Sequence, residues 1–111
     1  MNVQPNRDSC KAVYVPPEQW NDGEGYAPGA FTIETWTNGQ RAMLFNCPSD
    51  GSEQLIRLRP SSDEGPSWEF NGDLESPSLH PSVHRQTRQK NGTLRGTVWH
   101  GWLRQGEWVS C

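Results

Sequence analysis

Residues 30–45 read AFTIETWTNGQRAMLF, and this stretch decides the fold class. Apolar and polar side chains alternate over residues 31–36, which is typical of a half-buried β-strand. Asn38 and Gly39 follow, and an Asn-Gly pair readily takes the positive φ values of a two-residue type I′ turn. Residues 41–45 then return as a second apolar stretch. The pattern therefore predicts a β-hairpin.

Strand signals continue on the C-terminal side of this hairpin. The further strands that we expect are residues 54–59, 68–70, 93–103 and 108–111, the last two forming a final hairpin. Residues 76–84 contain two prolines, which restrict this segment to an edge strand or an irregular strand. The basic stretch 85–90 is expected to be an exposed hairpin tip.

The N-terminal part of the chain has a different composition. Proline and glycine are dense over residues 1–29 and exclude a long helix there, so we expect a loop-rich arm with one short strand at 11–15. Residues 30–111 form the predicted β core. A chain of 111 residues fits a single domain. The predicted fold class is all-β, built mainly from antiparallel hairpins.

The composition indicates a core built from a few large side chains. Hydrophobic residues make up 32% of the chain, but six of its residues are tryptophans, and each buried aromatic ring removes roughly 150–250 Å² from water. We therefore expect a Trp-rich core. The formal net charge of −3 gives no basic surface, which disfavours nucleic acid as a partner.

Neither a membrane span nor a signal peptide is visible in the sequence. No stretch approaches the roughly 20 apolar residues that cross a bilayer, and residues 1–8 lack an apolar centre. The three cysteines are an odd number and too sparse for a secreted disulfide scaffold. We expect a cytoplasmic protein whose thiols stay reduced or bind a metal.

The last hairpin contains the strongest candidate site. If Gln105 and Gly106 form a two-residue turn, counting outward places His100 opposite Cys111. Directly opposite residues have Cβ atoms about 4.5–5.5 Å apart, which suits a shared tetrahedral ion held by imidazole and thiolate. Cys47, in a turn before Pro48, is the natural third ligand. The pattern predicts a structural zinc ion.

The fourth ligand stays open between His80, His84, Cys10, Asp50 and water. His80 and His84 cannot both join, because four extended residues separate them by roughly 13 Å. Ordinary half-buried thiols explain Cys47 and Cys111 equally well, and the two histidines are more simply surface residues. Trp102, on the same face as His100, marks either a binding surface or part of the core.

Two catalytic alternatives use the same residues. Cys47 could act as a nucleophile with His100 as its base, a common pairing in enzymes. A zinc ion on Cys47, His100 and Cys111 would leave one open coordination position, as in zinc hydrolases. No nucleophile elbow, phosphate loop or zinc-protease motif accompanies them.

The order of several short segments resembles a family of small phage and prophage proteins of unknown function, some of them mislabelled ammonia monooxygenase. The segments that carry the resemblance are residues 45–48 (FNCP), 68–72 (WEFNG), 76–83 (SPSLHPSV) and 99–108 (WHGWLRQGEW). In that family the late histidine usually follows a cysteine and the early cysteine has cysteine neighbours. Here Trp99 replaces the first, and Ser49 and Asp50 replace the others.

The resemblance implies a phage-encoded protein that works in the host bacterial cytoplasm. The function we expect from it is a non-enzymatic, zinc-stapled β-domain that binds a host or phage protein, with counter-defence as one use. The alternatives are a small zinc-dependent hydrolase and a minor virion component.

Overall fold

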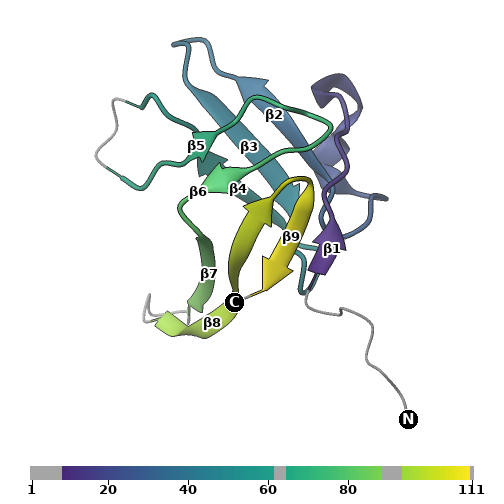
Figure 1. The fold of residues 1–111 in the computed structure, drawn as a ribbon, viewed down its shortest axis with the longest axis vertical. Helices are drawn as coiled ribbons and strands as arrows, with labels where there is room; N and C mark the ends of the chain where they lie inside the picture. The colour runs from purple at the N-terminus through teal and green to yellow at the C-terminus, as the bar shows by residue number, and fades with distance from the viewer. Residues whose placement is uncertain (1–8, 62–64, 89–93, 111) are drawn as a thin grey trace.

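The computed structural model describes residues 9–61, 65–88 and 94–110 of the chain (Figure 1). The described part consists of short strands and two single-turn 3-10 helices, and it contains no helix long and apolar enough to cross a membrane. Its elements are β1 (Ser9–Lys11), η1 (Pro17–Gln19), η2 (Asn21–Gly23), β2 (Phe31–Thr35), β3 (Arg41–Asn46), β4 (Glu53–Arg57), β5 (Glu69–Phe70), β6 (Leu79–His80), β7 (Val83–Arg88), β8 (Leu94–Arg104) and β9 (Glu107–Ser110).

These strands form three antiparallel sheets. One has the order β1-β9-β8-β7, the second β2-β3-β4, and the third pairs β5 with β6. In Figure 1 the blue β2-β3-β4 sheet lies toward the top and the yellow β8-β9 hairpin below it, with β1 alongside β9. The predicted all-β fold built from antiparallel hairpins is confirmed.

The first hairpin forms as predicted, but its turn is longer. The amide of Trp36 donates to the carbonyl of Gln40, so residues 37–39 make the loop. Gly39 has a φ of +89°, whereas Asn38 does not enter the left-handed region. The side chain of Asn38 instead accepts a hydrogen bond from the Gln40 amide at 2.9 Å. The predicted two-residue turn is wrong, because the Asn38 side chain caps the loop in place of a left-handed backbone.

The last hairpin has the predicted two-residue turn and register. Gln105 and Gly106 both have positive φ, at 47° and 85°, as a type I′ turn requires. The register pairs Gly101 with Ser110, Trp102 with Val109, Leu103 with Trp108 and Arg104 with Glu107. The predicted His100–Cys111 pair lies outside the described residues, because they end at Ser110.

Two other segments differ from the sequence prediction. The expected hairpin tip at 85–90 is strand up to Arg88, because β7 pairs with the long β8 and gains backbone hydrogen bonds that a polar pattern does not reveal. The expected strand at 11–15 is instead Ser9–Lys11, paired with β9. Tyr14 makes only an isolated bridge to Phe31.

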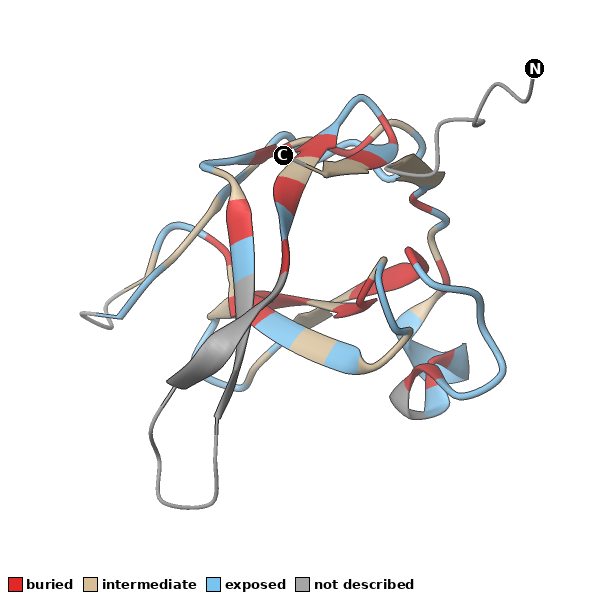
Figure 2. Cartoon of the chain, turned by 90° about the horizontal axis from the view of Figure 1, so that it is seen from below, coloured by how far each residue is buried: buried red, intermediate tan, exposed pale blue. Residues whose placement is uncertain are grey.

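Trp108 connects the two larger sheets. Its side chain is fully buried, stacks on Phe45 of β3 at a centroid distance of 4.6 Å, and meets the edge of Trp99 at 5.8 Å. Its indole Nε1 donates to the carbonyl of Gly29 at 2.9 Å. Figure 2 shows buried positions recurring along the strands of both sheets. The predicted Trp-rich core thus has one ring in contact with both sheets and with the N-terminal arm.

The described part of the N-terminal arm, residues 9–29, is fixed to the β2-β3-β4 sheet by polar contacts. The buried amide of Asn46 donates to the carbonyls of Gly23 and Tyr26 at 3.0 and 3.1 Å. The indole of Trp20, itself buried, donates to the carboxylate of Glu53 at 2.7 Å. Beyond the short β1 strand, this segment rich in proline and glycine therefore keeps one arrangement through side-chain and turn hydrogen bonds.

We expect Trp108→Ala to lower the free energy of unfolding by about 3–5 kcal/mol, because it leaves a cavity between the sheets. Trp102→Ala, in the same hairpin, should cost about 1–2 kcal/mol, since a half-buried ring covers less apolar area. Urea unfolding followed by circular dichroism measures both values. Equal losses in the two variants would contradict the central role of Trp108.

Candidate active site

A serine and two histidines meet where β7 pairs with β8. Ser82 lies between β6 and β7, and His84 is the second residue of β7. The Ser82 hydroxyl lies against the ring of His100, which in turn contacts the ring of His84. His100 of β8 is the register partner of His84. All three side chains therefore gather on one face of the sheet.

The contacts within this group are close. The Oγ of Ser82 and the Nε2 of His100 lie 3.1 Å apart, within hydrogen-bonding distance. The rings of His84 and His100 have centroids 4.8 Å apart and an interplanar angle of 30°. Both histidines are exposed and Ser82 is half-buried, so the group is open to a large substrate.

The segment that carries Ser82 is held from two sides. The indole Nε1 of Trp68 donates to the backbone carbonyl of Ser82 at 3.1 Å. Near the start of the same segment, the Gln105 amide donates to the Ser78 hydroxyl at 2.9 Å, and the Gly106 amide donates to the Pro77 carbonyl at 2.8 Å. These bonds hold Ser82 beside β8, although two prolines break the strand pattern here.

His100 owes its exposed position to its neighbours on β8. Trp99 and Gly101, on either side of it, are buried, so alternation turns the His100 imidazole outward. A Cβ atom added to Gly101 would collide with the carbonyl oxygen of Val109 and the ring of Trp99. The strand is therefore packed tightly beneath the histidine, and only glycine fits at that point.

The arrangement can activate a hydroxyl. In the tautomer that carries its proton on Nδ1, His100 accepts a hydrogen bond from the Ser82 hydroxyl through Nε2. A serine hydroxyl is a weak nucleophile until such a base removes its proton. The pair Ser82–His100 thus has the geometry needed for attack on a carbonyl carbon.

A shallow hollow of about 280 Å³ lies close by, at the β5-β6 pair. Its lining residues are Glu69, Phe70, Asn71, Ser78, Leu79 and His80. His80 is two residues before Ser82, and two residues of chain span at most about 7 Å. The hollow is therefore close enough to Ser82 to receive a neighbouring part of a substrate.

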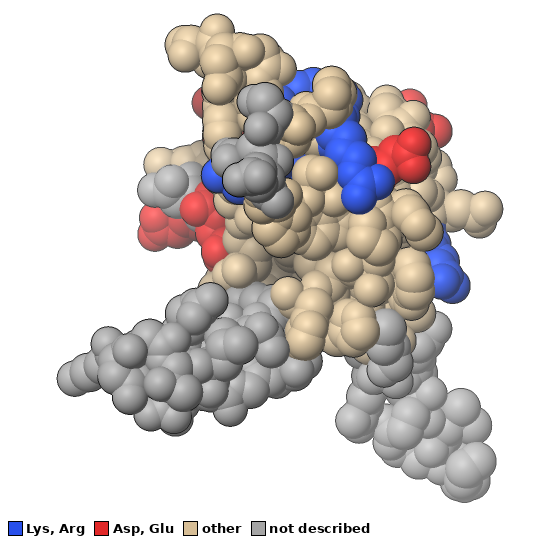
Figure 3. All heavy atoms as spheres, turned by 90° about the vertical axis from the view of Figure 1, so that its left-hand side faces the viewer, with Lys and Arg blue, Asp and Glu red and all other residues tan. Residues whose placement is uncertain are grey.

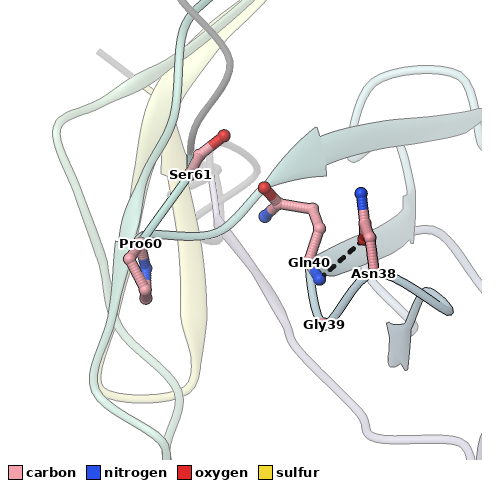
Figure 4. Close-up of a pocket in the computed structure, with 5 residues that line it drawn as sticks. All are labelled: Asn38, Gly39, Gln40, Pro60 and Ser61. Atoms are coloured by element: carbon pink, nitrogen blue, oxygen red, sulfur yellow. Dashed lines mark hydrogen bonds between the residues drawn. The ribbon is translucent and has the colours of Figure 1, made fainter.

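A second, larger hollow of about 450 Å³ lies where the β2-β3 loop meets the end of β4 (Figure 4). It is lined by Asn38, Gly39, Gln40, Pro60 and Ser61. The dashed line in Figure 4 is the bond between the Asn38 side chain and the Gln40 amide. Its lining includes no histidine, cysteine or carboxylate, so it presents no base for a nucleophile.

The predicted zinc ligands are not brought together in the described residues. Cys47 is fully buried at the end of β3 with its Sγ 3.2 Å from the Ser49 hydroxyl, whereas His100 is exposed and contacts Ser82 and His84. The described part of the chain contains no group of three or more His, Cys, Asp or Glu side chains that could hold a metal ion. Cys111, the remaining predicted ligand, lies outside it.

The other predicted residues separate as well. His80, an alternative fourth ligand, is exposed on β6 opposite Glu69. Trp102 is half-buried, and the guanidinium of Arg104 lies over its ring at 4.3 Å from the centroid. Its use as a binding surface stays a prediction.

The cysteines are poorly placed for nucleophilic chemistry. The fully buried Cys47 does not offer its thiol to a substrate. Burial raises the pKa of the Cys10 thiol, and the nearby Cys47 and Glu107 raise it further. A raised pKa keeps the thiol protonated near neutral pH, and the protonated form is a weak nucleophile. Ser82 is the better placed candidate.

A serine hydroxyl held against an exposed imidazole is the minimal constellation of a serine hydrolase. The family comparison leads to the same class. The chain belongs to the BubE family, described as bacterial ubiquitination-like system serine protease, whose family model matches residues 16–111. No curated protein and no solved structure gives a significant match to the chain.

The family match corrects the function expected from the sequence. A non-enzymatic phage accessory protein conflicts with a bacterial protease family, and so does a minor virion component. The hydrolase alternative fits better, although the zinc ion expected for it finds no support among the described residues. The non-enzymatic function expected from the resemblance is therefore wrong, and the family match gives no support to a phage origin.

Sequence reasoning missed Ser82 as a nucleophile. The residue lies within the SPSLHPSVH stretch, where the prolines suggested only an irregular strand. The sequence signal that could have found it is the Ser82-x-His84 spacing at the start of the strand that pairs with β8. That signal has meaning only once the β7-β8 register is known, because the register brings in His100.

Alkylation of Cys10 by iodoacetamide should require a higher pH in the folded protein than in urea, because unfolding removes the burial that raises its pKa. Peptide mass spectrometry over a series of pH values separates Cys10 from the other cysteines. The same pH midpoint in both states would contradict this environment.

Proposed function

We propose that this protein is a serine protease that cleaves peptide or isopeptide bonds in protein substrates of a bacterial ubiquitination-like system. Ser82 is the nucleophile and His100 is its general base. The single observation that carries the proposal is the 3.1 Å separation of Ser82 Oγ and His100 Nε2 on an open face of the sheet. The family description supports the class of reaction and the class of substrate.

The chemistry follows from the geometry. Ser82 Oγ attacks the substrate carbonyl carbon, its proton passes to His100 Nε2, and the carbonyl electron pair moves onto oxygen. When this intermediate collapses, the carbon–nitrogen bond breaks and the amine leaves with the proton from His100. Water, deprotonated by the same imidazole, then releases the acyl group and restores the Ser82 hydroxyl.

The surroundings of the site suit a protein substrate. His84 and His100 are exposed, and the hollow at β5-β6 can receive a substrate segment beside Ser82. Figure 3 shows one face of the molecule, on which basic side chains gather in the upper part and much of the described surface is neither acidic nor basic. Partner recognition on that surface would depend on shape and uncharged contacts more than on charge.

The state of the described cysteines supports a cytoplasmic location. Cys10 and Cys47 are free thiols in the described structure. Thiols stay reduced in the bacterial cytoplasm, where a ubiquitination-like system would meet its substrates. The cytoplasm therefore remains the location that we propose.

The test uses a fluorophosphonate–biotin probe, which esterifies activated serines with loss of fluoride. We expect one probe per chain on the wild-type protein, located at Ser82 by peptide mass spectrometry. Ser82→Ala should abolish labelling, and His100→Ala should slow it by at least roughly 100-fold, the scale of one general base.

Ser49→Ala is the matched control, because Ser49 is an exposed serine that contacts only the thiol of Cys47 among the contacts given for it. It should be labelled at the wild-type rate. Two outcomes would overturn the proposal. One is labelling of the Ser82→Ala variant at the wild-type rate. The other is a wild-type protein that unfolds cooperatively, and is therefore folded, but is not labelled.

A further inference from the structure

The pair Ser82–His100 lacks a described carboxylate at the imidazole. In serine proteases a third group usually fixes the orientation of the catalytic histidine. The described contacts of the His100 side chain are with Ser82 and His84. The group that lies against the His100 ring is therefore another imidazole.

The β7-β8 register explains why His84 occupies this place. The two histidines are directly opposite each other, and the pairs on either side of them are Val83 with Gly101 and Arg85 with Trp99. Opposite residues in an antiparallel pair have Cβ atoms about 4.5–5.5 Å apart. Two rings mounted this way can lie against each other, and the observed centroid distance is 4.8 Å.

We propose that His84 is a positioning residue, whose ring packs against the imidazole of His100 and holds it toward Ser82; this inference rests on the proposed serine protease activity. The two rings are tilted by 30° to each other, with their centroids 4.8 Å apart. Packing on one face restricts rotation of the His100 side chain, while its Nε2 stays directed at the Ser82 hydroxyl.

The physical strength of such a contact sets the expected effect. Aromatic pairs contribute a modest energy beyond area burial, which corresponds to roughly a 3- to 10-fold change in the population of the productive orientation. His84→Ala should therefore lower the maximal rate of fluorophosphonate labelling by roughly 3- to 10-fold. The probe concentration at half-maximal rate should not change, because a residue that only orients His100 alters the reaction step and not the binding of the probe.

A conservative variant separates positioning from other roles. His84→Phe keeps a flat ring in the same place but has no ring nitrogen, so it should restore the rate to within about twofold of wild type. His84 is exposed, so both variants should unfold at nearly the wild-type urea concentration. Leu55→Ala changes an exposed residue on β4 and is the control. Its rate of fluorophosphonate labelling should equal that of the wild-type protein.

Two results would overturn the inference. If His84→Ala is labelled at the wild-type rate, His84 does not position His100. If His84→Phe is as slow as His84→Ala, the ring nitrogens of His84 are required and stacking is not its role. Either result leaves the protease proposal standing as long as Ser82→Ala is unlabelled, whereas labelling of Ser82→Ala overturns the protease proposal itself.

Discussion

The packing of Trp108 against both larger sheets is the contact on which the other parts of the structure depend. Its ring stacks on Phe45 from one sheet and meets Trp99 within its own, while its indole donor satisfies the Gly29 carbonyl of the N-terminal arm. A chain with few aliphatic residues can still bury enough area this way, because each large ring replaces several smaller side chains. The position of β9, and with it the register of β8, follows from this anchor.

The candidate site is a direct product of that register. β8 has Trp99, Gly101 and Leu103 buried on the core side, so His100 faces outward. β7 pairs with the outer edge of β8 and places His84 opposite His100, while the indole of Trp68 holds the backbone at Ser82. The hydroxyl and the two imidazoles thus meet on the surface of a rigid sheet, although Ser82 itself belongs to a connection between strands.

Burial argues against Cys47 as a nucleophile, whereas the zinc site stays a prediction because Cys111 lies outside the described residues. Thiols and imidazoles are the first candidates in a sequence because they bind metals and act as nucleophiles. The residue type, however, does not say how deeply its side chain is buried. Cys47 is an inner core residue, and desolvation keeps the Cys10 thiol protonated. The serine gave no such signal, since serine is common in turns and its reactivity depends entirely on the base beside it.

Local pattern alone determined the strands β2 to β5, β8 and β9 to within a few residues, together with the last turn and the alternation along β8. These features depend on residues near one another in the chain: Gln105 and Gly106 specify the turn, and apolar periodicity specifies the buried face. It also placed the first hairpin correctly but gave it too short a turn, because the capping role of the Asn38 side chain was missed. The extension of β7, the burial of Cys47 and the meeting of Ser82 with His100 were decided by tertiary structure. The Ser82–His100 contact joins residues 18 positions apart through strand pairing and packing, and local preferences cannot encode the energy of that pairing.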